Sequence, residues 1–159
     1  MAEVALRPIE DSDLDALFDQ MRDPVSVRMA AFTAEDPDDR AAFDAHMAKV
    51  RTSPDVVLRA VTLDGRLVGS ISCFAVEGDT EITYWIDRPV WGRGVAGRAL
   101  ALFLDAVTVR PLHARAAGDN PASLRVLRKA GFAVIGTETS YAPARNAEIE
   151  ESVLRLDQG

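Results

Sequence analysis

The fold of this chain is decided by the stretch Trp91-Gly92-Arg93-Gly94-Val95-Ala96-Gly97-Arg98, which lies between a predicted strand and a predicted helix. Glycines allow a backbone to pass close to a ligand, and the free N–H groups of a first helical turn attract anions. Arg88, Arg93 and Arg98 fall within eleven residues that contain no acidic side chain. On a chain of net charge −7, this local excess indicates a ligand that carries phosphate. The stretch therefore predicts a cradle for a pyrophosphate.

Two other interpretations of the stretch remain open. Gly92, Gly94 and Gly97 match the Gly-x-Gly-x-x-Gly dinucleotide fingerprint, and Asp119 follows 22 residues after Gly97. Against this fingerprint, residues 87–91 separate the strand from the first glycine, and the preceding elements are not parallel strands. The stretch could instead be a flexible loop with solvent-facing arginines. A P-loop NTPase is excluded, because no Gly-Lys-Ser/Thr follows.

The part of the chain before this stretch predicts three strands in an antiparallel meander, preceded by one strand and two helices. Asp23-Pro24 ends the first helix, and Asp64-Gly65 is typical of a tight hairpin turn. Residues 30–39 are expected to form a loop. The expected strands cover residues 4–9, 56–63, 67–76 and 81–86, and the helices lie near residues 12–22 and 40–50.

The part after the stretch alternates between helix and strand. A helix follows the glycines and stops at Arg110-Pro111, and a second helix begins at Asn120-Pro121, a favoured N-cap followed by a favoured first position. Strands are expected at residues 112–117, 132–136 and 148–156, with a polar loop at 137–147. This alternation implies parallel pairing beside the meander. The chain is therefore predicted to form a mixed α/β sheet of about seven strands with about four helices, in one domain over residues 1–159.

Composition limits the functional classes. With 48% hydrophobic and 27% charged residues, the chain resembles an ordinary globular protein, and no apolar run reaches the ~20 residues of a membrane helix. A net charge of −7 argues against general nucleic-acid binding. Cys73 is the single cysteine and His46 and His113 are isolated, so neither a disulfide nor a metal site is expected. With no signal peptide at the N-terminus, the prediction is a cytoplasmic protein without membrane or nucleic-acid partners.

Two motifs resemble those of a known family. Residues 91–96 resemble the Gln/Arg-x-x-Gly-x-Gly/Ala acetyl-CoA motif of GNAT acetyltransferases, and are most similar to the subgroup of ribosomal-protein N-terminal acetyltransferases. Residues 119–132, with Asn120, Pro121 and Ser123, resemble the second signature of that subgroup. Leu6-Arg7-Pro8, with Asp11 and Asp13, resembles its opening. Trp91 departs from the pattern, since Gln or Arg is common there, and its side chain is expected to have no polar role.

The resemblance implies the GNAT fold and direct transfer of an acetyl group from acetyl-CoA, as co-substrate, to an amine acceptor, a small molecule or a protein N-terminus. It implies that the glycine stretch binds the pyrophosphate and that backbone groups of Trp85, Ile86 and Val90 to Trp91 bind the pantetheine arm. Which of Arg93 and Arg98 contacts which phosphate of coenzyme A stays open. The predicted cofactor-binding residues are Trp85, Ile86, Val90, Trp91, Gly92, Arg93, Gly94, Val95, Ala96, Gly97, Arg98, Asn120 and Ser123. Homodimers are common in the family.

Glu81 and Ser123 are the candidate catalytic residues. Glu81 begins the strand before the glycine stretch, where the family often has a glutamate, and it is the candidate base. Many members place a thiolate-protonating tyrosine at the position of Leu127, which cannot donate, so Ser123 is expected beside the leaving sulfur. The alternatives are that Glu81 is a solvated carboxylate at a strand end and that Ser123 only completes the Asn120 cap.

Overall fold

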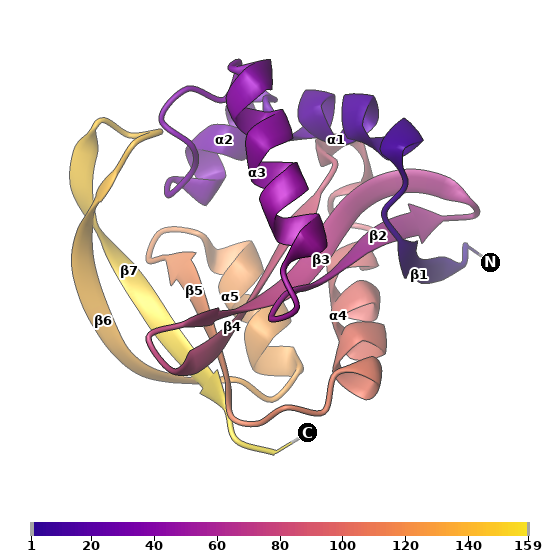
Figure 1. Cartoon of the computed structure of the whole chain (residues 1–159). Coiled ribbons are helices and arrows are strands. Elements are labelled where there is room, and N and C mark those ends of the chain that lie inside the picture. Colours follow the sequence, from indigo (N-terminus) through magenta and orange to yellow (C-terminus); the bar gives the residue numbers. More distant parts are fainter. Residues whose placement is uncertain (1, 159) are drawn as a thin grey trace.

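A seven-stranded sheet carries helices on both of its faces (Figure 1). The structure is a computed structural model and describes residues 2–158. Within the described residues β4 and β5 are the one parallel pair, and all other neighbouring strands are antiparallel, which confirms a mixed, mostly antiparallel α/β sheet. The strands, in their order across the sheet, are β1 (Val4–Pro8), β2 (Val57–Leu63), β3 (Arg66–Val76), β4 (Asp79–Ile86), β5 (Leu112–Ala117), β7 (Ala147–Leu156) and β6 (Ala133–Ala142).

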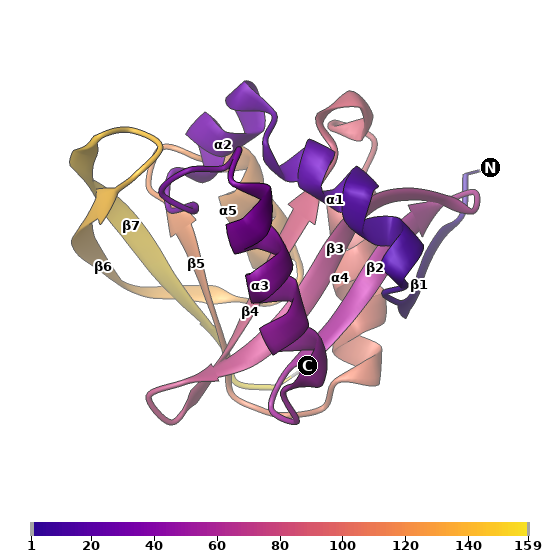
Figure 2. The same cartoon turned by 45° about the horizontal axis from the view of Figure 1, so that its top comes forward.

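The helices divide between the two faces of the sheet (Figures 1 and 2). One face carries α1 (Leu14–Met21), α2 (Pro24–Ala30) and α3 (Arg40–Thr52), and the other carries α4 (Val95–Ala106) and α5 (Pro121–Lys129). The short 3-10 helices η1 (Asp11–Asp13) and η2 (Arg88–Val90) precede α1 and the glycine stretch.

Helix α2 is the element that the sequence analysis did not predict. The Asp23 side chain accepts a hydrogen bond from the Ser26 N–H, and Pro24 occupies the first turn. Asp23-Pro24, interpreted above as the end of a helix, therefore also begins the next one, because an acidic N-cap followed by proline is a strong start signal.

The core lies between the sheet and the pair α4–α5. Phe103 and Leu100 of α4, Leu127 of α5, and Leu112 and Leu154 of the sheet are almost completely buried. Burial of each such side chain contributes roughly 1.5–3 kcal/mol relative to an exposed one. Packing at these positions therefore fixes α4 and α5, and the segments that precede them, against the sheet.

The C-terminal hairpin is longer than the sequence analysis predicts. The prediction of a loop over residues 137–147 is wrong, because β6 continues to Ala142 and β7 begins at Ala147. Most β6 side chains are exposed on this edge strand, so the alternation that identifies a half-buried strand is absent. The hairpin end is tied to α2: Arg145 donates to the Arg28 carbonyl at 2.6 Å and forms an ion pair with Asp119 at 2.7 Å.

The opening segment that resembles the family has a structural role in this chain. Arg7 forms two hydrogen bonds to the Asp13 carboxylate, at 2.7 and 2.8 Å, and Asp13 also accepts from the Glu10 backbone N–H. The Asp13 residue is 5% exposed. The Arg7 bond holds the pKa of Asp13 below its usual value. This pair fixes the end of β1 to the start of α1.

Candidate active site

Strands β4 and β5 pair at one end and then separate. Their register contains Thr80–Leu112 and Glu81–His113, although β4 runs on to Ile86 and β5 to Ala117. Figure 2 shows the two strands diverging, with α5 behind them. We call β4 residues 82–86 the open edge of β4, since no strand pairs with them on the β5 side.

Backbone groups along this edge are directed by strand alternation. The Asp87 N–H donates to the Val68 carbonyl of β3 at 2.7 Å. Neighbouring residues of a strand direct their N–H and C=O groups to opposite sides, so those of Ile86 and Tyr84 point away from β3. The open edge can therefore pair with a ligand that carries amide groups, such as the pantetheine arm.

The glycine stretch leads from this edge to the N-terminus of α4. Gly92 and Gly94 have φ of 79° and 75°, a region that favours glycine, and Gly94 is the N-cap residue. No atom lies within 4 Å of a Cβ built at Gly92, Gly94 or Gly97, so the surface beside them is open. Gly94 provides no side-chain cap for the first N–H groups of α4. These N–H groups and the open surface suit a bound anion.

Two of the three predicted arginines are already engaged with the protein. Arg88 forms two hydrogen bonds to the Asp23 carboxylate, at 2.8 and 3.1 Å. Arg98 donates to the Ala2 carbonyl at 2.8 Å and to the Arg93 carbonyl at 3.1 Å. Both guanidinium groups therefore hold the ends of the stretch in place.

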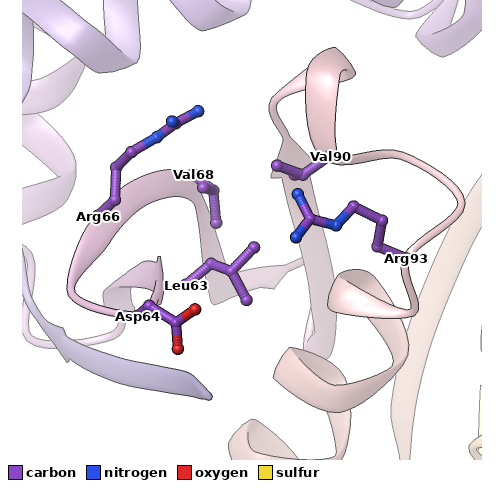
Figure 3. A pocket seen from close by; sticks show the side chains of 6 residues that line it. All are labelled: Leu63, Asp64, Arg66, Val68, Val90 and Arg93. Carbon is purple, nitrogen blue, oxygen red and sulfur yellow. The ribbon is translucent and has the colours of Figure 1, made fainter. Parts of the chain in front are cut away.

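Arg93 has no ion-pair partner among residues 2–158, and its side chain lines a pocket of about 310 Å³. Figure 3 shows the Arg93 and Arg66 side chains on opposite sides of this pocket, with Asp64 on the Arg66 side. Leu63, Val68 and Val90 complete the lining. The same range contains no ion-pair partner for Arg66. The sequence analysis missed Arg66, because it follows an ordinary hairpin turn and has no local motif.

The Trp91 side chain has a polar role, so the expectation to the contrary is wrong. Its indole N–H donates to the Ile86 carbonyl at 2.8 Å, while 40% of the residue stays exposed. This bond occupies the carbonyl at the last residue of the open edge. Trp85 points to the other face and donates its indole N–H to the Gln20 carbonyl of α1 at 3.0 Å.

Glu81 lies on the face that carries α1 to α3 and belongs to a cluster of charges. Its side chain is 15% exposed, and its carboxylate lies 3.4 Å from the Arg115 guanidinium. Arg115 also pairs with Glu138 at 2.7 Å and with Glu151 at 3.1 Å. Burial raises the pKa of Glu151, opposed by its bond to Arg115. Glu81 is therefore largely shielded from solvent, and its contact with the shared arginine is the longest of the three.

Ser123 lies in the first turn of α5, on the opposite face. Its backbone N–H donates to Oδ1 of Asn120 at 3.2 Å, which confirms the predicted cap. Its hydroxyl lies 2.9 Å from the hydroxyl of Tyr84, which extends from the open edge of β4. Burial raises the pKa of Tyr84.

Tyr84 and Arg115 are site residues that sequence reasoning missed. Tyr84 alternates with Ile82 and Ile86, so the pattern indicated only a core side chain. Arg115 stands between Ala114 and Ala116, and a charge among small apolar residues was a usable signal for a polar face. Its partners come from three strands, which no local pattern predicts.

Two further structural findings concern residues 2–158. No helix there is long and apolar enough to cross a membrane. No group of three or more His, Cys, Asp or Glu side chains in that range is arranged to hold a metal ion. The buried Cys73 has a pKa raised by burial, as expected for a core thiol.

The fold is α/β, and its parallel strands β4 and β5 separate after a short paired region. The glycine stretch and the N-terminus of α4 form an anion cradle beside them. The sequence pattern of the acetyltransferase (GNAT) domain matches residues 3–133. The chain therefore belongs to the GNAT acetyltransferase family, which confirms the expected family and fold.

Solved structures share this fold at low sequence identity. Mycobacterium smegmatis RimJ in complex with CoA-disulfide has a TM-score of 0.82 and 22% identity, covering 97% of this chain and 81% of that one. Spermidine N-acetyltransferase from Vibrio cholerae, in complex with CoA and spermine, has a TM-score of 0.81 and 16% identity, covering 98% of this chain and 95% of that one. A phosphinothricin acetyltransferase from Sinorhizobium meliloti, in complex with AcCoA, has a TM-score of 0.82 and 18% identity, covering 98% of this chain and 89% of that one. A search of curated protein sequences finds no match.

Proposed function

We propose that the chain, as one domain over residues 1–159, is an acetyl-CoA-dependent N-acetyltransferase that acts on a primary amine by direct attack in a ternary complex. The observation that carries this proposal is the open edge of β4, which leads into the glycine stretch. An edge of backbone amides next to an anion cradle matches a ligand with an amide-containing arm and a pyrophosphate. A dinucleotide-binding domain fits poorly, because the described sheet has one parallel pair.

The cofactor-binding roles follow from these groups. N–H groups at Val95, Ala96 and Gly97 would hold the pyrophosphate. Backbone groups of Ile86 and the carbonyls of Val90 and Trp91 would hold the pantetheine arm, because the N–H groups of Val90 and Trp91 already donate within the η2 turn. The predicted part of Trp85 is not supported, because its backbone groups point to β3. The Ile86 carbonyl already accepts from Trp91, so the Ile86 N–H is the group left for the ligand. Asn120 uses its side-chain oxygen as the cap, which leaves its NH₂ group to reach the arm.

Among the predicted arginines, Arg93 is the one free to meet a phosphate. Together with Arg66 it gives the pocket two positive charges against the single negative charge of Asp64 (Figure 3). Arg88 and Arg98 instead keep the stretch in shape through Asp23 and the backbone.

Glu81 is proposed as the general base on the acceptor side. The attacking amine must lose a proton, and a carboxylate that is largely buried yet only loosely paired can accept it, directly or through water. Ser123 on the other face is proposed to donate a hydrogen bond to the departing sulfur. Glu81 and Ser123 thus approach the open edge of β4 from opposite faces of the sheet.

The acceptor is proposed to be a primary amine, either a small molecule or a protein N-terminus. Spermine in the Vibrio cholerae structure is an amine ligand of the same fold, and RimJ is the neighbour from the predicted subgroup. A cytoplasmic location rests on the lone Cys73, and homodimerisation rests on the family alone.

The test is a thermal-shift titration followed by a turnover assay. Acetyl-CoA at ~100 Kd should stabilise the protein by ~2.7 kcal/mol through mass action. Gly94→Asp should abolish the shift, because a carboxylate in the cradle repels pyrophosphate, and because Gly94 has φ of 75° its fold must be checked separately by circular dichroism. Stabilisation by NADH but not by acetyl-CoA would refute the proposal. Binding without CoA release, across a panel of amines, would leave a non-catalytic acyl-CoA module.

A further inference from the structure

Tyr84 and Ser123 form a hydrogen bond that joins β4 to α5 across the region where β5 has moved away. The two hydroxyl oxygens are 2.9 Å apart, and the residues lie 39 positions apart in the chain. Tyr84 packs against the core cluster that contains Ile82, Ile86 and Leu127. The bond therefore joins the middle of the open edge of β4 to the first turn of α5.

The surroundings decide which hydroxyl donates. A hydroxyl has one proton to donate and two lone pairs to accept with. Within residues 2–158, the Tyr84 hydroxyl has Ser123 as its one hydrogen-bond partner, and its ring is partly buried against the apolar core. If Ser123 donated to Tyr84, the phenolic proton would face apolar side chains, at a cost of the order of 1–3 kcal/mol. The arrangement in which Tyr84 donates avoids this cost and leaves the Ser123 proton free for another partner.

We propose that Tyr84 is a positioning residue for Ser123: by donating to the Ser123 oxygen, it directs the Ser123 proton toward the sulfur of the acyl donor. This inference rests on the proposed function, because it assigns a role within the same site. A hydroxyl that accepts one hydrogen bond becomes a stronger donor in the next. Because burial keeps the Tyr84 pKa above its usual value, the phenol stays protonated near neutral pH.

The bonding changes balance without ionising Tyr84. The amine nitrogen forms the new C–N bond and loses its proton to Glu81 or to water held by Glu81. The C–S bond breaks, and its electron pair stays on sulfur as a thiolate, stabilised by the Ser123 O–H. Coenzyme A thiolate then takes a proton from solvent, and Glu81 releases to solvent the proton that it accepted. Tyr84 and Ser123 begin and end the cycle with their own protons.

The experiment compares ligands that differ at sulfur, so that it does not depend on the acceptor. Binding of CoA and of an analogue with hydrogen in place of the thiol is measured at pH 9, where a thiol of ordinary pKa, about 8.5, is mostly ionised. Wild type should prefer CoA by roughly 10-fold or more. Ser123→Ala and Tyr84→Phe should each remove most of that preference. The double variant should lose little more, since the two residues act as one unit.

Kinetics and a matched control separate positioning from structure. Tyr84→Phe keeps the ring in the core and should lower kcat roughly 3- to 30-fold, while the KM for acetyl-CoA stays unchanged. The control is Tyr141→Phe, which removes the hydroxyl that donates to Asn146 on the exposed hairpin, and it should change neither value. A Tyr84→Phe variant with wild-type preference for CoA overturns the inference. Wild type that binds no CoA overturns the proposed function instead, whereas binding without turnover leaves the inference to be judged by the ligand preference.

Discussion

The ion pair between Asp23 and Arg88 joins the start of α2 to the segment before the glycine stretch. Asp23 accepts from Arg88 and also from the backbone N–H and hydroxyl of Ser26, at 3.0 and 2.9 Å. These bonds, with that from Arg88 first, lower the Asp23 pKa from 3.8 to about 2. The substitution Asp23→Asn removes the charge and keeps a good N-cap residue, so it isolates the ion pair from the cap.

The magnitude follows from the pKa difference. A change from 3.8 to about 2 corresponds to at most roughly 2.4 kcal/mol, at ~1.36 kcal/mol per pKa unit. The Asp23 and Arg88 side chains are 21% and 49% exposed, so solvent screening reduces the expected value to about 1 kcal/mol. Because the folded-state pKa is depressed, this stabilisation is complete only well above the unfolded pKa of 3.8 and is lost as the pH falls through about 2.

Urea unfolding at pH 7 and at pH 2.5 measures this effect directly. Asp23→Asn should lower the free energy of unfolding by about 1 kcal/mol at pH 7, with a smaller difference from wild type at pH 2.5. The control Asp38→Asn breaks a more exposed pair with Arg22 and should have no measurable effect. An equal loss for Asp23→Asn at both pH values would show that the cap, and not the charge, was lost. No loss at pH 7 would show that the ion pair contributes nothing.

Three further outcomes are expected. Glu81→Gln should lower kcat by roughly 10² with little change in acetyl-CoA affinity, and its rate should recover as pH rises and the amine deprotonates unaided; an unchanged rate from pH 6 to 9 would remove Glu81 from the mechanism. Arg93→Ala and Arg66→Ala should each weaken CoA more than dephospho-CoA if the pocket receives the 3′-phosphate, as competition titrations would measure; equal losses would assign them to the pyrophosphate. Phe103→Ala should destabilise the protein by about 3–5 kcal/mol in urea, because this side chain is fully buried; a loss below 1 kcal/mol would contradict the described core.

The sequence predicted the parts of the fold that local chemistry determines. Asp64 and Gly65 have φ of 52° and 83°, as the hairpin motif requires, and Asn120 caps α5 as its position before proline indicates. Strand β6 was truncated in the prediction, because an edge strand with solvent on both faces has no alternating apolar pattern. Helix α2 was missed because Asp23-Pro24 carries the signals for an end and a start together.

The candidate site was predictable only as far as motifs extend. The glycine stretch, Glu81 and Ser123 were all located from sequence, and their functional roles remain predictions. The partners of the two catalytic candidates are distant in the sequence: Tyr84 is bonded to Ser123, and Arg115 lies beside Glu81. Such pairings depend on which strands become neighbours, and a β4–β5 junction formed by residues 32 positions apart has no local signature.

Helix α2 connects the two strand ends that move apart. At its start, Asp23 is bonded to Arg88, just beyond β4, and near its end the Arg28 carbonyl is bonded to Arg145, which also pairs with Asp119, just beyond β5. Helix α2 thus bridges the segments that follow β4 and β5, and its two ends hold these segments at a fixed separation. Seven residues of helix span about 10 Å. The length of α2 therefore helps to set the distance between the ends of β4 and β5. Shortening or extending α2 by one turn would change that distance without altering any residue between the two strands.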